Sequence, residues 1–258
     1  MQAEPVVSVL RLSGAIGTGS RTPLSDQALA PLIERAFKRG KPTAVALLIN
    51  SPGGSPVQSS LIAARIRRLA DEKNMPVYAF VEDVAASGGY WLAVAADEIW
   101  ADSCSILGSI GVISGTFGAA EFLERHGLER RVYTAGKSKS QLDPFLPEKP
   151  EDVTRLKVLL DEMHEAFKAH IRNRRGSKLD ADSDLFTGEF WLGDTAVKLG
   201  LADGIGHLVP KMKELYGDKV KLVPYGGKKS WAQRFGMNLS QDVLAGIEER
   251  AAYARFGL

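Results

Sequence analysis

Cysteine and histidine are scarce in this sequence of 258 residues. The single cysteine, Cys104, excludes an internal disulfide and a cysteine-based metal site. The four histidines are scattered, and His164 and His170 lie six residues apart, not at the i, i+4 spacing that places two ligands on one helix face. We therefore expect no metal site.

Long apolar runs are also missing. No segment has the length of a membrane span, and the N-terminus lacks the basic and apolar regions of a signal peptide. We expect the chain as given to be soluble, either cytoplasmic or peripheral to a membrane, and the compartment stays open.

Charge gives no strong preference for a partner. The chain has 33 basic and 31 acidic side chains, a net charge of +2, which does not favour nucleic acid or an anionic membrane. The clustered Arg172, Arg174 and Arg175 are typical of a helix end, where cations complement the helix dipole. Hydrophobic residues make up 45% of the chain, enough to build a sizeable core.

The first hundred residues alternate between two kinds of hydrophobic pattern. Short apolar runs predict strands, and apolar positions spaced by three or four predict helices. The expected strands are 6–12, 43–49 and 76–81, and the expected helices are 24–39, 57–70 and 88–96. Strands that alternate with helices predict parallel βαβ units and an α/β fold.

The rest of the chain continues this pattern less regularly. We expect short strands at 98–101, 111–113 and 131–134, a loop at 136–150, a long helix at 151–175 and a smaller βα unit at 186–206. Residues 231–258 form a separate amphipathic segment behind the glycine-lysine linker 226–229. We therefore divide the chain into a main α/β domain, 1–228, and a C-terminal amphipathic tail, 229–258.

Two glycine-rich turns each follow a buried strand directly. The first is Ser51-Pro52-Gly53-Gly54-Ser55, and the second is Ala85-Ala86-Ser87-Gly88-Gly89-Tyr90. In parallel α/β sheets the carboxyl ends of the strands are where sites are built, so the two turns can face one another. Ser87 is then a candidate nucleophile, and the amides of Gly88 and Gly54 are candidate oxyanion donors. The alternative is that Ser87 only caps the following helix.

A serine nucleophile needs a base, and the histidines give no clear candidate. His126 falls at the charged end of a short helix, and His164, His170 and His207 have no distinctive context. A buried lysine with a lowered pKa can serve instead, and Lys137 and Lys139 follow a predicted strand. An ordinary surface role stays open for either lysine.

Taken together, the motifs resemble the signal peptide peptidase A family of serine peptidases. The resemblance rests on five stretches in order, over about residues 7–215: Asn50 to Gly54, Ala86 to Tyr90, Gly108 to Ile113, Gly136-x-x-Lys139 ahead of Pro144-Phe145, and Gly193-x-x-Ala196 leading to Gly206.

This resemblance implies a Clp-protease/crotonase-like fold, a Ser–Lys dyad of Ser87 and Lys139, and an oxyanion hole of Gly54 and Gly88. It also implies that Ser109 orients the lysine, that no cofactor is needed, and that the chain assembles into a homo-oligomeric ring, commonly an octamer. The implied substrates are unfolded or hydrophobic peptides such as cleaved signal peptides. Ser140 stands where the family often has an acidic residue after the lysine, so Lys137 stays a minor rival for the base.

Two other function classes are weighed against the peptidase. A crotonase-type acyl-CoA enzyme would share the glycine oxyanion hole but use carboxylates as acid and base. A catalytically inactive scaffold or adaptor would keep the fold without using Ser87.

Overall fold

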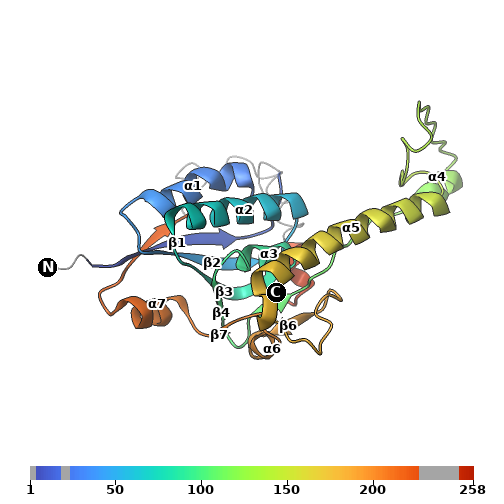
Figure 1. The fold of residues 1–258 in the computed structure, drawn as a ribbon. Coiled ribbons are helices and arrows are strands. Elements are labelled where there is room, and N and C mark those ends of the chain that lie inside the picture. Colours follow the sequence, from blue (N-terminus) through green and yellow to red (C-terminus); the bar gives the residue numbers. More distant parts are fainter. Residues whose placement is uncertain (1–3, 19–23, 227–249) are drawn as a thin grey trace. The chain divides into compact units, whose positions relative to one another are not determined.

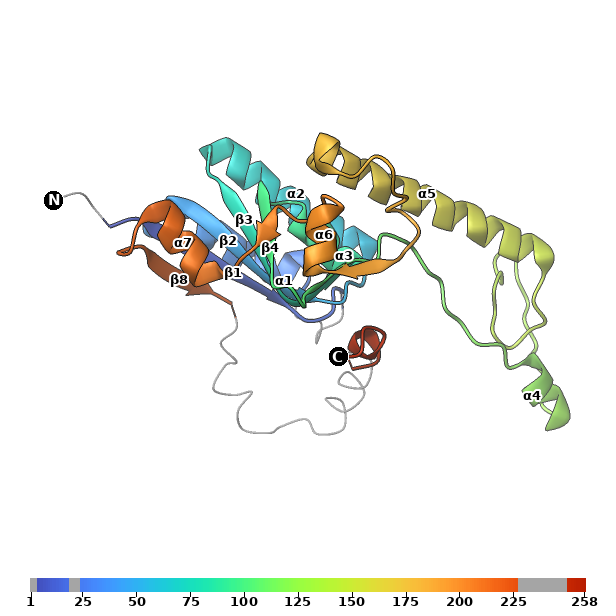
Figure 2. The ribbon, with the colours of Figure 1, turned by 90° about the horizontal axis from the view of Figure 1, so that it is seen from below.

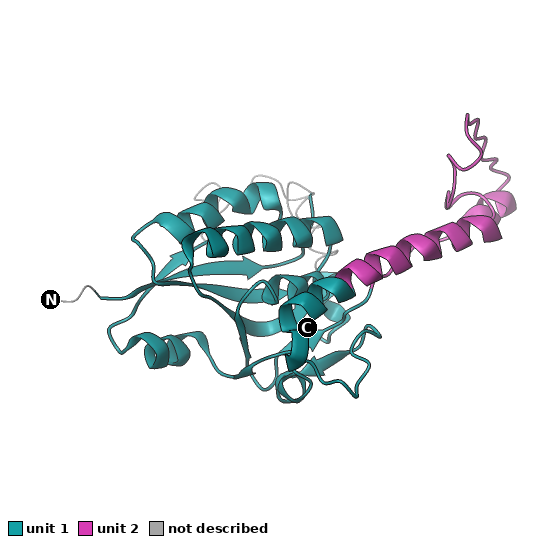
Figure 3. Ribbon diagram, in the orientation of Figure 1, with its two compact units in different colours: residues 1–111, 168–258 teal, residues 112–167 magenta. Residues whose placement is uncertain are grey.

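The computed structural model describes residues 4–18, 24–226 and 250–258, which are drawn in colour in Figure 1. The chain divides into two compact units (Figure 3). Unit 1 comprises Met1–Gly111 and Lys168–Leu258, and unit 2 comprises Val112–Phe167. The predicted boundary near residue 228 and most of the predicted tail lie outside the described residues.

Unit 1 is built on an eight-stranded sheet whose main path runs β6-β5-β3-β2-β1-β8, with β4 and β7 joined beside β3. All strand pairs are parallel except β5 with β6. The predicted α/β fold class is therefore confirmed. The strands are β1 (Val6–Ser13), β2 (Ala44–Ser51), β3 (Val77–Ala86), β4 (Glu98–Ala101), β5 (Ile106–Gly108), β6 (Phe190–Leu192), β7 (Gly204–Ile205) and β8 (Lys221–Tyr225).

Helices cover both faces of this sheet. Figures 1 and 2 show α1 (Asp26–Lys38) and α2 (Pro56–Lys73) on one face and α7 (Leu208–Tyr216) on the other. Met212 of α7 is fully buried in a cluster with strand residues that include Val7 and Phe80. Unit 1 also contains α3 (Gly88–Ala93), the last turns of α5 (Pro150–Arg175), the short 3₁₀ turn η1 (Gly176–Lys178) and α6 (Gly193–Lys198), and the described residues 250–254 are helical.

Local sequence explains where the first helices begin. Ser25 caps α1 by accepting a hydrogen bond from the Ala28 amide, and Ser55 caps α2 by accepting one from Gln58. Pro56 occupies the first turn of α2, where a missing N–H costs nothing. The apolar run of β2 is buried on both faces of the sheet, with Val45 and Leu47 fully inaccessible.

Unit 2 contains α4 (Ala120–Arg125), most of α5 (Pro150–Arg175) and irregular backbone. Only Asp152 and Phe167 are buried among its residues, all of which the structure describes. Large apolar side chains are exposed instead, among them Ile113, Phe117, Phe122, Leu128 and Tyr133. Unit 2 therefore buries almost no core of its own.

Two of the predicted short strands are wrong. Residues 111–113 and 131–134 have no strand structure. Both fall in or next to unit 2, where the chain runs without a neighbouring strand to pair with, and the β-rich composition of 131–134 cannot form a ladder alone. The strand in this part of the chain is Ile106–Gly108 instead, which pairs with Val84–Ala86 on one side and with Phe190–Leu192 on the other.

Among the helices of the described ranges, none combines the length and the apolar character needed to cross a membrane.

Candidate active site

The two predicted glycine turns meet at the carboxyl ends of β2 and β3. A Cβ atom placed on Gly53 would lie 2.8 Å from the Ala86 oxygen, 2.8 Å from the Gly88 nitrogen and 2.9 Å from Ser87 Cβ. A Cβ atom on Gly89 would lie 2.3 Å from the Ser51 oxygen. The turns thus pack backbone against backbone, and only glycine allows this approach.

Ser87 connects β3 to α3 in a backbone conformation that L-residues rarely adopt, with φ 51° and ψ −120°. Its side chain is half-buried and makes no capping hydrogen bond to α3. An ordinary N-cap serine has an extended backbone and accepts a bond from the next turn, as Ser25 does. The capping alternative therefore does not describe Ser87, because this serine has neither the extended backbone nor the side-chain hydrogen bond of an N-cap.

The two amides predicted as oxyanion donors, those of Gly54 and Gly88, belong to turns whose backbone contacts the structure defines. The Gly88 amide follows Ser87 directly, and it lies beside the Gly53 Cα hydrogens, where a side chain would crowd it. Ile16 bonds to the residues on either side of Gly54, through Ile16 N–H to the Gly53 oxygen and Ser55 N–H to the Ile16 oxygen. In such a parallel bridge the amide of the middle residue points away, so the Gly54 N–H is turned outward from Ile16.

Ser109 lies on the neighbouring strand end. The Ser87 amide donates to the Gly108 oxygen at 2.8 Å, and Ala86 and Gly108 are register partners. Ser87 and Ser109 therefore lie side by side, each directly after the last paired residue of its strand. Both have positive φ, 51° and 52°. The Ser109 amide donates to the Glu189 oxygen at 2.6 Å, which joins this turn to the segment before β6.

The candidate bases Lys139 and Lys137 belong to unit 2, whereas Ser87, Ser109, Gly54 and Gly88 belong to unit 1. Both lysine side chains are exposed, and the Lys139 amide donates to the Gly136 oxygen at 3.2 Å in a turn. The family resemblance predicts a role for the lysine, and within unit 1 the structure brings together the turns that contain Gly54, Ser87 and Ser109.

The histidines occupy other surroundings. His126 is exposed and contacts the Phe122 oxygen through Nδ1 at 2.8 Å, as its position at a charged helix end predicts. His207 Nε2 lies 2.8 Å from Asp102 Oδ2, and the pKa of Asp102 is lowered by the Cys104 amide and by His207. His170 stacks on Trp91 with ring centroids 4.5 Å apart, and burial lowers the pKa of His170. Within the described ranges, no cluster of His, Cys, Asp and Glu side chains could hold a metal ion.

The described C-terminal residues, 250–258, lie beside the serine turn. Tyr253 and Phe256 pack against Val84, Ala86 and Ile106, and the Tyr253 hydroxyl donates to the Asn50 oxygen at 2.8 Å. The Phe256 ring meets the Phe190 ring edge to face, with centroids 5.1 Å apart. The end of the chain thus covers an apolar surface formed by strand residues next to Ser87.

Sequence reasoning missed the role of the arginines at the end of α5. They were expected only to complement a helix dipole, but Arg175 is 4% exposed and its guanidinium donates to the Gly200 oxygen and to Asp203. Arg174 bonds to carbonyl oxygens that follow α3, the helix that Ser87 begins. The periodicity of the sequence assigns these residues to a helix end, but it cannot predict which carbonyl and carboxylate groups they contact.

Comparison with known proteins gives the family. The profile of Peptidase family S49 matches residues 70–219, more than half of the chain. The chain belongs to this family, and its resemblance to signal peptide peptidase A is confirmed.

Three curated relatives illustrate the range of similar sequences. The chain is 48% identical to a Brucella melitensis protein named Na(+)/H(+) antiporter NhaA, over 99% of this chain and 37% of that protein. It is 31% identical to the chloroplastic serine protease SPPA of Arabidopsis thaliana, over 78% of this chain and 29% of that protein. It is 30% identical to the probable protease SohB of Haemophilus influenzae, over 92% and 66%. The chain thus spans about a third of the length of the first two.

Solved structures support the fold. A lysine-to-alanine mutant of the 1510-N membrane-bound stomatin-specific protease, in complex with a substrate peptide, has a TM-score of 0.55 at 14% identity, over 90% of this chain and 96% of that one. A serine-to-alanine mutant of the same protease has a TM-score of 0.51 at 14% identity, over 88% and 100%. The architecture is that of these proteases, which confirms the predicted Clp-protease/crotonase-like fold.

Proposed function

We propose that the chain is a serine endopeptidase with a Ser–Lys dyad, in which Ser87 is the nucleophile and Lys139 the general base. The observation that carries the proposal is the strained, uncapped Ser87 turn packed against Gly53, in a chain of Peptidase family S49. Strain of this kind costs about 1–3 kcal/mol and persists where the surroundings enforce it. A serine that served only the fold would have no reason to hold it.

The proposed chemistry balances over two steps. Neutral Lys139 takes the proton of Ser87 Oγ as that oxygen attacks the peptide carbonyl carbon, and the amides of Gly54 and Gly88 stabilise the oxyanion. Lys139 then gives this proton to the leaving amine as the C–N bond breaks. Water then attacks the acyl-enzyme carbonyl and loses a proton to Lys139. As the ester bond to Ser87 Oγ breaks, Lys139 returns this proton to Oγ, which releases the carboxylic acid product and regenerates Ser87 and neutral Lys139.

The exposure of Lys139 bears on where the dyad is completed. A lysine base works only in its neutral form, which burial favours and contact with water does not. Lys139 is exposed, and unit 2 around it buries almost nothing. We therefore propose that chains assemble into a ring-like homo-oligomer, such as an octamer, in which Lys139 is buried against Ser87 of an adjacent chain.

Exposed apolar side chains of unit 2 support an assembly of this kind, because large exposed apolar surfaces mark contacts with other chains. Tyr133 is 91% exposed and Ile113 is 70% exposed. The proposed substrates are unfolded or hydrophobic peptides, such as cleaved signal peptides. The apolar surface beside Ser87, which holds Tyr253 and Phe256, is suited to apolar side chains.

A fluorophosphonate probe tests the proposal. The parent chain should become labelled on Ser87 and should hydrolyse an unstructured peptide, whereas Ser87→Ala and Lys139→Ala should each lose hydrolysis while keeping the far-UV circular dichroism of the parent. Loss of one member of such a unit costs nearly as much as loss of both. A Lys139→Ala chain with near-parent turnover would refute the dyad, and Lys137→Ala would then be the next variant.

The same variants separate the two alternatives. An inactive scaffold would take no label in any form. A crotonase-type enzyme would turn over acyl-CoA in the Ser87→Ala chain, which a serine peptidase would not.

A further inference from the structure

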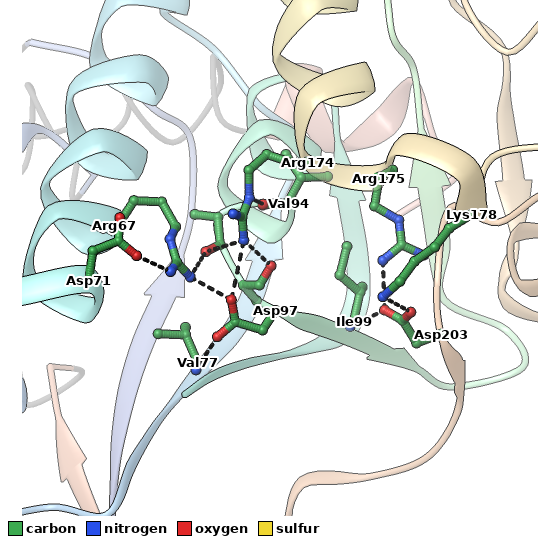
Figure 4. A network of polar contacts seen from close by, with 12 residues as sticks. Arg67, Asp71, Val77, Val94, Asp97, Ile99, Arg174, Arg175, Lys178 and Asp203 are labelled. Atoms are coloured by element: carbon green, nitrogen blue, oxygen red, sulfur yellow. Dashed lines mark hydrogen bonds and ion pairs between the residues drawn. The ribbon is translucent and has the colours of Figure 1, made fainter. Parts of the chain in front are cut away.

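The helix that Ser87 begins is held at its far end by two arginines from other helices (Figure 4). Arg174, near the end of α5, donates through Nε to the Val94 oxygen and through Nη2 to the Ala96 oxygen, each at 2.8 Å. Arg67 of α2 donates through Nη1 to the Ala95 oxygen at 3.1 Å. Three successive carbonyls after α3 thus accept hydrogen bonds from guanidinium groups.

The two arginines share one carboxylate. Asp97 Oδ1 lies 2.8 Å from Arg67 Nη1 and 3.4 Å from Arg174 Nη2. Its other oxygen accepts from the Val77 amide at 2.8 Å, at the start of β3. Asp97 therefore offsets the repulsion between the two cations and ties them to the strand that leads to Ser87. We call Arg67, Asp97 and Arg174 the arginine clamp.

Further contacts hold the sides of α3. The His170 ring stacks on Trp91, and the Tyr90 hydroxyl donates to the Leu201 oxygen at 2.8 Å. A helix of six residues cannot hold its own shape, since isolated helices shorter than about 12 residues are marginal in water. The position of α3 is therefore set by its tertiary contacts, and the arginine clamp makes those at its C-terminal end.

We propose that Arg174 and Arg67 are positioning residues that set the location of Ser87 Oγ and of the Gly88 amide through α3. The helix is only about 9 Å long at 1.5 Å per residue. A shift of its C-terminal end therefore moves its N-terminal end, where Ser87 lies, by a similar distance. A misplacement of about 1 Å can cost about a hundredfold in rate. This inference rests on the proposed function of Ser87.

The test compares the rate and the endpoint of fluorophosphonate labelling in the full-length chain. The variants are Arg174→Met and Arg67→Met, which keep an apolar stem and remove the donors, together with Arg174→Lys. The matched controls are Arg172→Met, whose guanidinium stacks on Phe186 at 4.7 Å, and Arg68→Met, which pairs with Glu72 within α2. Each control lies on the same helix as its test residue but donates to no carbonyl of 94–96 in the described contacts.

The expected result is a labelling rate constant at least tenfold below the parent for both test variants, with an endpoint that stays at one label per chain. The rate of peptide hydrolysis at saturation should fall by the same factor and KM should change little. Arg174→Lys should recover part of the rate, because an ammonium keeps the charge and can donate to a carbonyl but lacks the rigid fork with which the guanidinium holds the Val94 and Ala96 carbonyls. The controls should stay within twofold of the parent.

Three outcomes overturn the inference. An Arg174→Met chain that labels at the parent rate would show that α3 keeps its place without the clamp. A lowered endpoint with an unchanged rate constant would show that the arginines only maintain the folded fraction, and Arg174→Lys gives the same readout if Arg174→Met does not fold. A parent that labels no better than Ser87→Ala would overturn the proposed function together with this inference.

Discussion

Replacing Gly53 with alanine tests the packing of the two turns with a single methyl group. The added Cβ would meet the Ala86 oxygen and the Gly88 nitrogen at 2.8 Å each, and Ser87 Cβ at 2.9 Å. Real Cβ atoms do not approach backbone atoms so closely, so one turn must move. Every atom that the added Cβ would meet belongs to the turn of the proposed nucleophile, so a movement of either turn changes the position of Ser87 relative to Gly53 and Gly54.

Two costs add in this variant. Gly53 has φ +99°, and an L-residue in this region is strained by about 1–3 kcal/mol. Overpacking a rigid site costs about another 1–3 kcal/mol. We expect the free energy of unfolding to fall by about 2–6 kcal/mol. The rate of fluorophosphonate labelling should fall at least a hundredfold because Ser87 and the Gly88 amide shift together.

Gly40 provides a matched control. It also has positive φ, +78°, but a Cβ atom there would meet nothing within 4 Å. Gly40→Ala should therefore lower the free energy of unfolding only by the strain of an alanine at positive φ, about 1 kcal/mol. It should be labelled at the parent rate. Urea unfolding gives the stability of both variants, and the labelling rate on the folded fraction gives the activity. A Gly53→Ala chain that labels as fast as Gly40→Ala would refute the reasoning.

Four further predictions follow from the proposed site and its surroundings. Mixing inactive Ser87→Ala chains with inactive Lys139→Ala chains should restore part of the peptidase activity if the dyad forms between chains, and a mixed assembly that stays inactive would place both residues in one chain. Peptidase activity should rise with pH into mildly alkaline solution because the base must be neutral, and Ser109→Ala should weaken it; an acidic optimum, or a Ser109→Ala profile equal to the parent's, would contradict this. Burial opposes ionisation of Asp203, but hydrogen bonds from Arg175, Lys178 and the Ile99 amide hold its pKa below the ordinary value, so its stabilising effect should be present above about pH 4 and lost as pH falls through the folded-state pKa. Asp203→Asn should therefore lower the free energy of unfolding in urea by about 3 kcal/mol at pH 7 and by progressively less in acid. A loss that is equal at pH 7 and pH 3 would contradict this assignment. Deleting residues 231–258 should change the oligomer size in size-exclusion chromatography or the rate of peptide hydrolysis, and no change in either would retire a role for the tail.

The sequence predicted the sheet and the turns because their signals are local. Buried strands such as 44–49 read as apolar runs, and glycine pairs after them mark backbone that must bend or approach closely. The positive φ of Ser87 has no such signal, because serine gives no hint of a strained backbone. The arginine clamp was missed for a similar reason, since the backbone carbonyls that Arg174 contacts lie 78–80 residues away and no side-chain pattern reveals them.

The division of the chain into two units explains why the strand predicted at residues 131–134 does not form. Their side chains suit a pleated sheet, but a strand also needs a neighbour with free N–H and C=O groups, and unit 2 supplies none in the described chain. The motif Gly136-x-x-Lys139, which follows residues 131–134 closely, is also exposed. A catalytic lysine needs a dry environment, and a segment with almost no buried residues cannot create one by itself. The lack of packed neighbours within unit 2 thus explains why the predicted strand does not form, and it also leads us to propose that a second chain lies beside Lys139.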